Sequence, residues 1–297
     1  MVTVYTLAEE NIRKTWVLIF FIFFLILFLG WLFSYFFENN LFLILAIILA
    51  TIQSFSAYWY SDKIVLAMTG AKEIKKEDNP ELYRIVENLS ITAGIPTPRV
   101  YILNEAQPNA FATGRDEKHS AIAVTRGLLE KLERTELEGV IAHEISHIKN
   151  KDILLASAIV VLVGAISLLA NWFLRMGYFR PRKKEERGNL IFFLLGILGA
   201  ILAPFVANLI RLAISRKREF LADASAVLLT RYPEGLISAL EKISNDQSQL
   251  KRIDPSTAHL FIVSPFKGKE IESWLVKIFS THPPIEERIK ELKKVAF

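Results

Sequence analysis

The chain has 297 residues, 52% of them hydrophobic and 21 of them Phe, with a formal net charge of +5 and no cysteine. The lack of cysteine excludes disulfides, thiolate metal sites and a cysteine nucleophile, which leaves His and carboxylate side chains as metal ligands. Lys and Arg gather beside apolar runs, so the positive charge favours anionic lipid headgroups over nucleic acid as the partner.

Two apolar runs near the start of the sequence predict an N-terminal transmembrane hairpin over residues 1–60. The spans are expected at about 16–37 and 41–60, because a helix needs about 20 apolar residues to cross a bilayer. Arg13 and Lys14 precede the first run, as in a signal peptide. The run is longer than the roughly 7–15 residues of a signal h-region and no small-x-small cleavage site follows, so we expect an uncleaved anchor.

Residues 61–152 have the character of a soluble α/β domain and form the first part of a predicted catalytic domain. Their patterning predicts helices at 80–94, at 127–132, and from a Thr135 cap with Glu138 at the capping-box position through His147. It predicts strands at 99–103 and 121–125, with 108–114 as a loop or strand edge.

A second hydrophobic hairpin, residues 153–214, is predicted to divide the catalytic domain, which resumes over 215–297. Its runs, about 153–174 and 190–214, are each long enough to span a bilayer. The basic loop between them disagrees with two full crossings, because most other Lys and Arg lie at the opposite ends of the runs. The hairpin therefore either crosses, or dips into the membrane or packs on the domain. The majority of charges predicts a cytoplasmic catalytic domain in a multi-pass plasma-membrane protein.

The second part of the catalytic domain, residues 215–297, is expected to be helical. Helices are predicted at 218–229, at 235–243 and after the Pro283-Pro284 pair.

The pentapeptide at residues 143–147 carries the strongest chemical signal. His143 and His147 are four apart on the predicted helix, so both imidazoles project from one face and can ligate one metal ion. Glu144 lies about 100° round the helix, where it can take a proton from zinc-bound water and return it to the leaving amine. The alternative is a chance match on a surface helix.

A catalytic zinc needs a third protein ligand, and no third His follows at metzincin spacing. Glu219 and Asp223 lie four apart on a later predicted helix and can face the same way. We assign Glu219 as the third ligand and Asp223 as the acceptor of a ring N–H from a ligating His, which fixes the tautomer of that ring. The alternative is a solvated helix face rich in Arg and Glu.

The three other histidines have weaker signals. His282 precedes two prolines that hold an extended backbone, so it is a candidate donor to a developing oxyanion, with Arg288 in the next helix as a candidate assistant. The alternative is a helix-capping segment. His119 and His259 stand in polar context and are predicted to be surface residues.

These motifs, in this order and spread over nearly the whole chain, resemble the HtpX family of membrane-bound zinc metallopeptidases, related to CAAX prenyl proteases. Beside the N-terminal hairpin, the matching pieces are Asn109–Gly114, His143–His147, Lys151-Asp152, Arg218–Asp223 and Thr281–Pro284. The resemblance implies a gluzincin-type site, with His143, His147 and Glu219 on zinc and Glu144 as base. It also implies proteolytic quality control of misfolded or membrane proteins.

In peptidases of this kind the substrate adds as a strand to an edge at the active site. By analogy we expect that edge near Asn109 and along Ala121, Ile122, Ala123 and Val124.

The expected fold class is mainly α with a small β-sheet, namely a multi-pass helical membrane protein carrying a gluzincin-like zinc peptidase domain with one Zn²⁺ per chain. Its expected partners are polypeptide substrates and the lipid bilayer, and the sequence does not predict the oligomeric state. Two alternatives stay open. A membrane scaffold with a structural zinc would have a closed site, usually of four protein ligands. A prenyl-protein protease would need more spans, enclosing a chamber.

Overall fold

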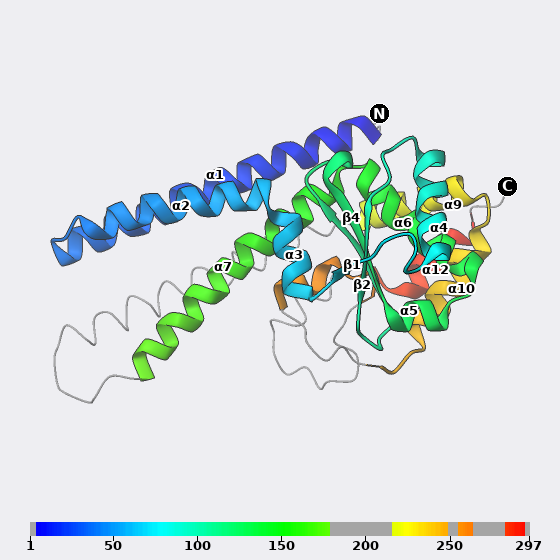
Figure 1. Cartoon of the computed structure of the whole chain (residues 1–297). Coiled ribbons are helices and arrows are strands. Elements are labelled where there is room, and N and C mark those ends of the chain that lie inside the picture. Colours follow the sequence, from blue (N-terminus) through cyan, green and yellow to red (C-terminus); the bar gives the residue numbers. More distant parts are fainter. Residues whose placement is uncertain (1–3, 179–215, 249–254, 264–282, 295–297) are drawn as a thin grey trace.

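The computed structural model describes residues 4–178, 216–248, 255–263 and 283–294. In this part of the chain helices surround one small sheet, and a long apolar hairpin extends away from it (Figure 1). The helices are α1 (Val4–Phe37), α2 (Leu41–Trp59), α3 (Ser61–Thr69), α4 (Pro80–Ala93), η1 (Glu117–His119), α5 (Arg126–Lys131), α6 (Arg134–Lys149), α7 (Asp152–Tyr178), α9 (Arg216–Thr230), α10 (Pro233–Ser244), η2 (Pro255–Leu260) and α12 (Ile285–Leu292). The strands are β1 (Lys72–Glu73), β2 (Arg99–Leu103), β3 (Ala110–Gly114) and β4 (Ser120–Thr125).

The sheet has the strand order β1-β2-β4-β3, so β4 lies inside it. Ala121 pairs with Arg99 of the parallel neighbour β2 and with Thr113 of the antiparallel neighbour β3. The prediction that residues 121–124 form a free edge is therefore wrong, and β3 is the edge strand on this side. Period-two patterning shows which faces of a strand are buried, but it does not show which strand is outermost.

The two faces of the sheet enter different hydrophobic clusters. Ile122 and Val124 belong to the cluster that contains Ile141 of α6, together with residues of α4 and α10. The alternate residues Ala121 and Ala123 share a cluster with residues of α3, α7 and η2. Because side chains alternate along a strand, both faces of the sheet are covered, and all six residues of β4 are buried.

Helix α6, which carries the pentapeptide, is a core helix. Ile141, Ile145 and Ile148 are fully buried, and each such burial contributes about 1.5–3 kcal/mol. The alternative of a chance motif on a surface helix is therefore wrong. The helix begins with a capping box between Glu133 and Glu136, so the prediction of a cap at Thr135 with Glu138 is also wrong. Glu138 instead pairs with Arg134 across one exposed turn, at 3.0 Å.

Helix α10 holds α6 in place by close backbone contact and by a buried carboxylate. A Cβ atom added to Gly139 would lie only 2.7 Å from the backbone nitrogen of Leu236, so only glycine fits one turn before His143. Glu136 accepts hydrogen bonds from Ser238 at 2.5 Å and from Lys242 at 2.8 Å. Burial would raise the pKa of Glu136, but these hydrogen bonds and the charge of Lys242 lower it.

Two helices of the described chain, Glu9–Phe37 and Leu41–Trp59, are long and apolar enough to cross a membrane. Most of their large side chains are exposed, as at Phe24 and Ile44. The first half of α7 packs against this hairpin through a shared apolar cluster. The prediction that the third run is helical is confirmed by α7, whereas the fourth run, 190–214, lies outside the described residues.

Candidate metal centre

Three side chains from two helices converge at the centre of the domain. His143 and His147 lie on consecutive turns of α6, and their Nε2 atoms are 3.1 Å apart. Helix α9 brings Glu219 opposite them, with carboxylate oxygens 3.7 Å from His143 Nε2 and 3.6 Å from His147 Nε2. One candidate ligand atom from each residue lies within 4.8 Å of the others. The structure thus brings Glu219 together with the two histidines, as expected from the sequence.

These separations suit a tetrahedral metal ion. Bonds of about 2.0–2.1 Å to a tetrahedral zinc place neighbouring ligand atoms about 3.3 Å apart. The two Nε2 atoms are 3.1 Å apart, and each lies 3.6 or 3.7 Å from one of the two Glu219 oxygens. Two imidazoles and one carboxylate are also a donor set of catalytic zinc sites, in which three protein ligands leave one position open. The residues present therefore fit a catalytic metal.

His143 is oriented from behind by a buried ion pair. Its Nδ1 atom lies 2.9 Å from Asp223 Oδ1, and Arg288 binds both oxygens of Asp223, at 2.9 Å through Nε and 2.6 Å through Nη2. Burial would raise the pKa of Asp223, but the charge of Arg288 and the hydrogen bonds from His143 and Arg288 lower it to about 2. The ionised carboxylate holds the ring proton on Nδ1, which leaves Nε2 free to ligate. This is the arrangement predicted for Asp223.

Arg288 is not placed where a substrate carbonyl could lie. Its side chain is fully buried, and besides Asp223 it approaches Glu219 at 3.9 Å and donates to the carbonyl oxygen of Ile262 at 3.4 Å. The geometry gives no support to the predicted assistance at an oxyanion, because the guanidinium lies behind His143. The other half of that prediction, His282, lies outside the described residues.

His147 is oriented by a different carboxylate, Asp152, whose Oδ2 lies 2.9 Å from His147 Nδ1. Lys151 has a φ of 57°, which reverses the chain between α6 and α7 so that Asp152 returns onto the ring. Burial would lower the pKa of His147, but the hydrogen bond to Asp152 and the charges of Glu219, Asp152 and Glu144 raise it to about 9. The surroundings of this ring therefore favour positive charge, which a metal ion supplies.

The role of Asp152 was missed in the sequence, where it was only part of a family motif. Its position in the sequence could have indicated this role, because a carboxylate at the start of a long apolar run needs a polar partner when it is buried.

The remaining candidates differ in burial. Glu144 is 3% exposed and follows His143 on α6, and its charge raises the pKa of His147. His119 is exposed and pairs with Asp116 at 2.7 Å, which confirms the surface prediction. The same prediction for His259 is wrong, since this residue is 3% exposed and its Nε2 lies 3.2 Å from a carbonyl oxygen of α7. Its polar sequence context does not reveal that η2 packs onto α7.

Asn109, just before β3, hydrogen-bonds to a later segment of the chain at the outer side of this strand. Its side chain donates to the carbonyl oxygen of Val263 at 2.9 Å and accepts from the N–H of the same residue at 3.3 Å. The N–H of Ile262 donates to the carbonyl oxygen of Ala110 at 3.2 Å. Residues 262–263 thus cover the beginning of this edge.

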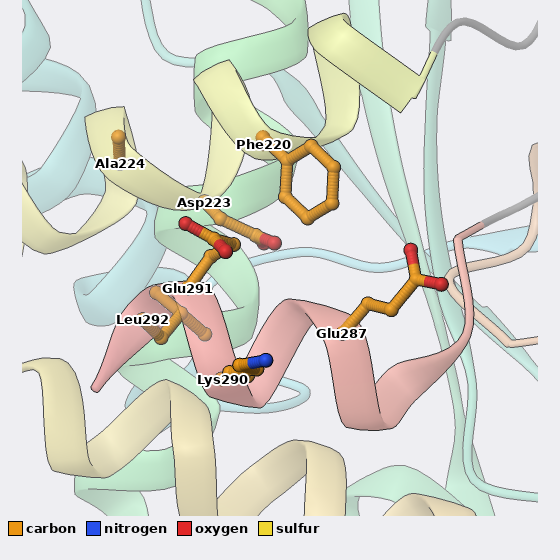
Figure 2. A pocket seen from close by; sticks show the side chains of 7 residues that line it. All are labelled: Phe220, Asp223, Ala224, Glu287, Lys290, Glu291 and Leu292. Carbon is orange, nitrogen blue, oxygen red and sulfur yellow. The ribbon is translucent and has the colours of Figure 1, made fainter. Parts of the chain in front are cut away.

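A cavity of about 640 Å³ opens between α9 and α12, beside Asp223 (Figure 2). It is lined by Phe220, Asp223, Ala224, Glu287, Lys290, Glu291 and Leu292. Asp223 belongs to the surroundings of His143, but His143, His147 and Glu219 are not among the lining residues. The cavity is therefore distinct from the side on which a metal ion would be held.

A buried helix with this His-Glu-x-x-His motif, completed by a carboxylate from a second helix, is the site of a metalloprotease. A model described as Peptidase family M48 matches residues 76–296, and the chain belongs to peptidase family M48.

The chain is 47% identical to "Protease HtpX homolog" of Dictyoglomus turgidum, over 98% of this chain and 94% of that one. It is also 47% identical to the protein of the same description from Thermoanaerobacter pseudethanolicus, over 99% and 98% of the two chains. Among solved structures, Ste24p of S. mikatae is similar in fold, with a TM-score of 0.50 and 20% identity over 97% of this chain and 67% of that chain.

Proposed function

We propose that this chain is a zinc-dependent endopeptidase held at a membrane. In this proposal His143, His147 and Glu219 hold the zinc and Glu144 is the general base. The observation that carries it is the convergence of His143, His147 and Glu219, of which one candidate ligand atom each lies within 4.8 Å of the others, beside the buried carboxylate of Glu144. Polypeptides are the substrates, and misfolded or membrane proteins are the class we propose.

When bound, zinc supplies a Lewis acid that polarises a peptide carbonyl and acidifies water. The chain supplies the proton transfer, for which Glu144 is placed one residue after a ligand. Glu144 accepts the proton of the attacking water and returns it to the amine nitrogen as the peptide bond breaks. Asp223 and Asp152 bind Nδ1 of His143 and of His147, which leaves Nε2 of each ring for the metal. Arg288 keeps Asp223 ionised.

We assign the substrate backbone to the outer edge of β3 in place of β4. The N–H of Thr125 donates to the carbonyl oxygen of Asn109, so alternate residues of β3 direct their backbone groups toward β4. Ala112, one of the intervening residues, therefore directs its N–H and C=O away from the sheet. An extended peptide can add there by strand pairing.

Membrane attachment is proposed from the hairpin of α1 and α2. Exposed apolar faces on both helices suit contact with lipid chains. Arg13, Lys14 and Lys63 lie at the ends of this hairpin nearest the catalytic domain, and by the positive-inside rule they support a cytoplasmic catalytic domain. Helix α7 leaves the domain toward the same side as the hairpin (Figure 1), which suits a second membrane-associated segment.

The decisive experiment compares the full-length protein with Glu144→Gln in a casein cleavage assay, together with zinc analysis. We expect the variant to keep one zinc per chain and to lose cleavage by a factor of about 10²–10⁴. Glu138→Gln, on the exposed side of the same helix, is the matched control and should cleave normally. Unchanged cleavage by Glu144→Gln would overturn the assignment of the base, and stoichiometric zinc in Glu219→Ala would overturn that of the third ligand.

Membrane topology can be tested by labelling a single introduced cysteine, because the chain has no cysteine of its own. A cysteine introduced at Lys184 is expected to be labelled by an impermeant reagent in intact cells if the second hairpin crosses fully. Absence of labelling would contradict two full crossings.

A further inference from the structure

The polar residue Asn11 lies in the N-terminal part of α1, ahead of the apolar run. It is 2% exposed, whereas the neighbouring Glu9 and Arg13 are exposed. Thr15, one turn later, is also buried and donates to the backbone carbonyl of Asn11 at 2.8 Å. This end of the membrane hairpin lies beside the catalytic domain (Figure 1), so the buried polar face of α1 is turned toward the domain.

Both ends of the Asn11 amide are engaged by residues of the domain. Its Nδ2 donates to Asp152 Oδ1 at 2.7 Å, and its Oδ1 accepts from Arg218 Nη1 at 2.8 Å. Arg218 Nη1 also lies 3.7 Å from Asp152 Oδ1. The second oxygen of Asp152 binds His147 Nδ1, and Arg218 directly precedes Glu219. Asn11 therefore touches the carboxylate that orients His147 and the residue next to Glu219.

Asparagine is the residue type that this position requires. The amide must donate to a carboxylate and accept from a guanidinium at the same time. Aspartate has the same shape, but it would only accept and would place a second negative charge against Asp152. Alanine would leave Asp152 and Arg218, which are 8% and 5% exposed, without this bridging partner.

We propose that Asn11 is a positioning residue for the metal centre and couples the membrane hairpin to the orientation of His147. The inference rests on the proposed zinc site. It also gives the two histidines separate supports. His143 depends on Asp223 and Arg288, both within the catalytic domain, whereas His147 depends on Asp152, which is bridged to α1.

The test is the affinity of full-length protein in detergent for Zn²⁺, measured by chelator competition, together with the visible absorption of the Co²⁺-substituted protein. Asn11→Ala and Asn11→Asp are each expected to weaken Zn²⁺ binding about ten-fold, the lower end of the range for outer partners of ligands. They should also change the Co²⁺ absorption bands, which report ligand geometry. Thr15→Val is the matched control, because Thr15 is buried on the same face of α1 and its hydroxyl donates within its own helix.

A double-mutant cycle distinguishes positioning from general loss of structure. In an Asp152→Ala background, Asn11→Ala should have little further effect on Zn²⁺ affinity, whereas in an Asp223→Asn background its effect should be undiminished. Wild-type affinity and Co²⁺ spectra in both Asn11 variants would overturn the inference. So would equal effects in the two backgrounds, or a Thr15→Val variant that loses as much affinity. Failure of the wild-type chain to bind zinc would instead overturn the proposed function.

Discussion

Replacing Arg288 by methionine removes a positive charge from the interior and leaves an unbranched side chain in place of the aliphatic part of arginine. Arg288 is fully buried and makes two short hydrogen bonds to Asp223. Burial alone would raise the pKa of Asp223, but the charge of Arg288 is the main cause that lowers it to about 2 from an ordinary value of 3.8, so the folded protein favours the ionised form. Without Arg288 the burial of Asp223 is uncompensated, and its carboxylate no longer holds His143 through a stable charge.

Loss of one partner of a buried ion pair costs about 3–5 kcal/mol. At about 2–4 °C per kcal/mol for a domain of this size, Arg288→Met should melt about 6–20 °C lower than wild type. The assay is thermal unfolding of the full-length protein in detergent, performed with chelator so that metal binding does not contribute. Arg134→Met is the matched control, because it breaks an exposed ion pair with Glu138, and such pairs contribute about 0–1 kcal/mol.

Asp223→Asn in the same background checks the physical reason. It removes the uncompensated charge, so the double variant should lose less stability than the two single losses added together, with a coupling of about 0.5–3 kcal/mol. Additive losses, or an Arg288→Met variant that melts like wild type, would refute the reasoning.

Three further variants test the supports of the site. Glu136→Gln should lower stability at neutral pH by about 1.5–3 kcal/mol, since Glu136 bonds a charged Lys242. The pKa of Glu136 is lower in the folded state than in the unfolded state. Its contribution to stability is therefore complete above the unfolded-state pKa and is lost as the pH falls through the folded-state pKa. In denaturant unfolding, the stabilities of variant and wild type should converge at acidic pH. Melts that stay parallel would contradict this. Gly139→Val should force α10 away from α6 and cost about 1–3 kcal/mol, whereas Gly164→Ala, with 3.6 Å to its nearest neighbour, should melt nearly as wild type. Asn109→Ala loses two hydrogen bonds to Val263 and should cost about 1–3 kcal/mol in the same assay; His119→Ala, at the exposed surface, should change stability by less than about 0.5 kcal/mol.

Local elements of the domain could be predicted well because their causes are local. The predicted helix at 80–94 corresponds to α4 (Pro80–Ala93) and the predicted strand at 99–103 to β2, since an Asn79 cap, a proline at the helix start and Gly94 at its end are readable in the sequence. The ligand set could be predicted for a similar reason. Residue types and a four-residue spacing specify the two histidines that a zinc ion needs, and the Glu219–Asp223 pair shows the same four-residue spacing on a later predicted helix.

Features that depend on tertiary contact could not be predicted in this way. The order of the strands and the burial of His259 are both determined by segments distant in sequence. The support of His147 is the clearest case. Asn11 and Asp152 are 141 residues apart, and no periodicity or spacing rule connects an amide ahead of a hydrophobic run with a carboxylate after a metal-binding helix.

The buried pair behind His143 also imposes an order in time. A ribosome adds about 5–20 residues per second, and His143 precedes Arg288 by 145 positions, so roughly 7–30 s pass between their synthesis. During that interval the nascent chain already contains both histidines, but the cation that keeps Asp223 ionised has not yet been made. The ion pair that supports His143 can therefore form only after Arg288 has been synthesised, later than both histidines and Glu219.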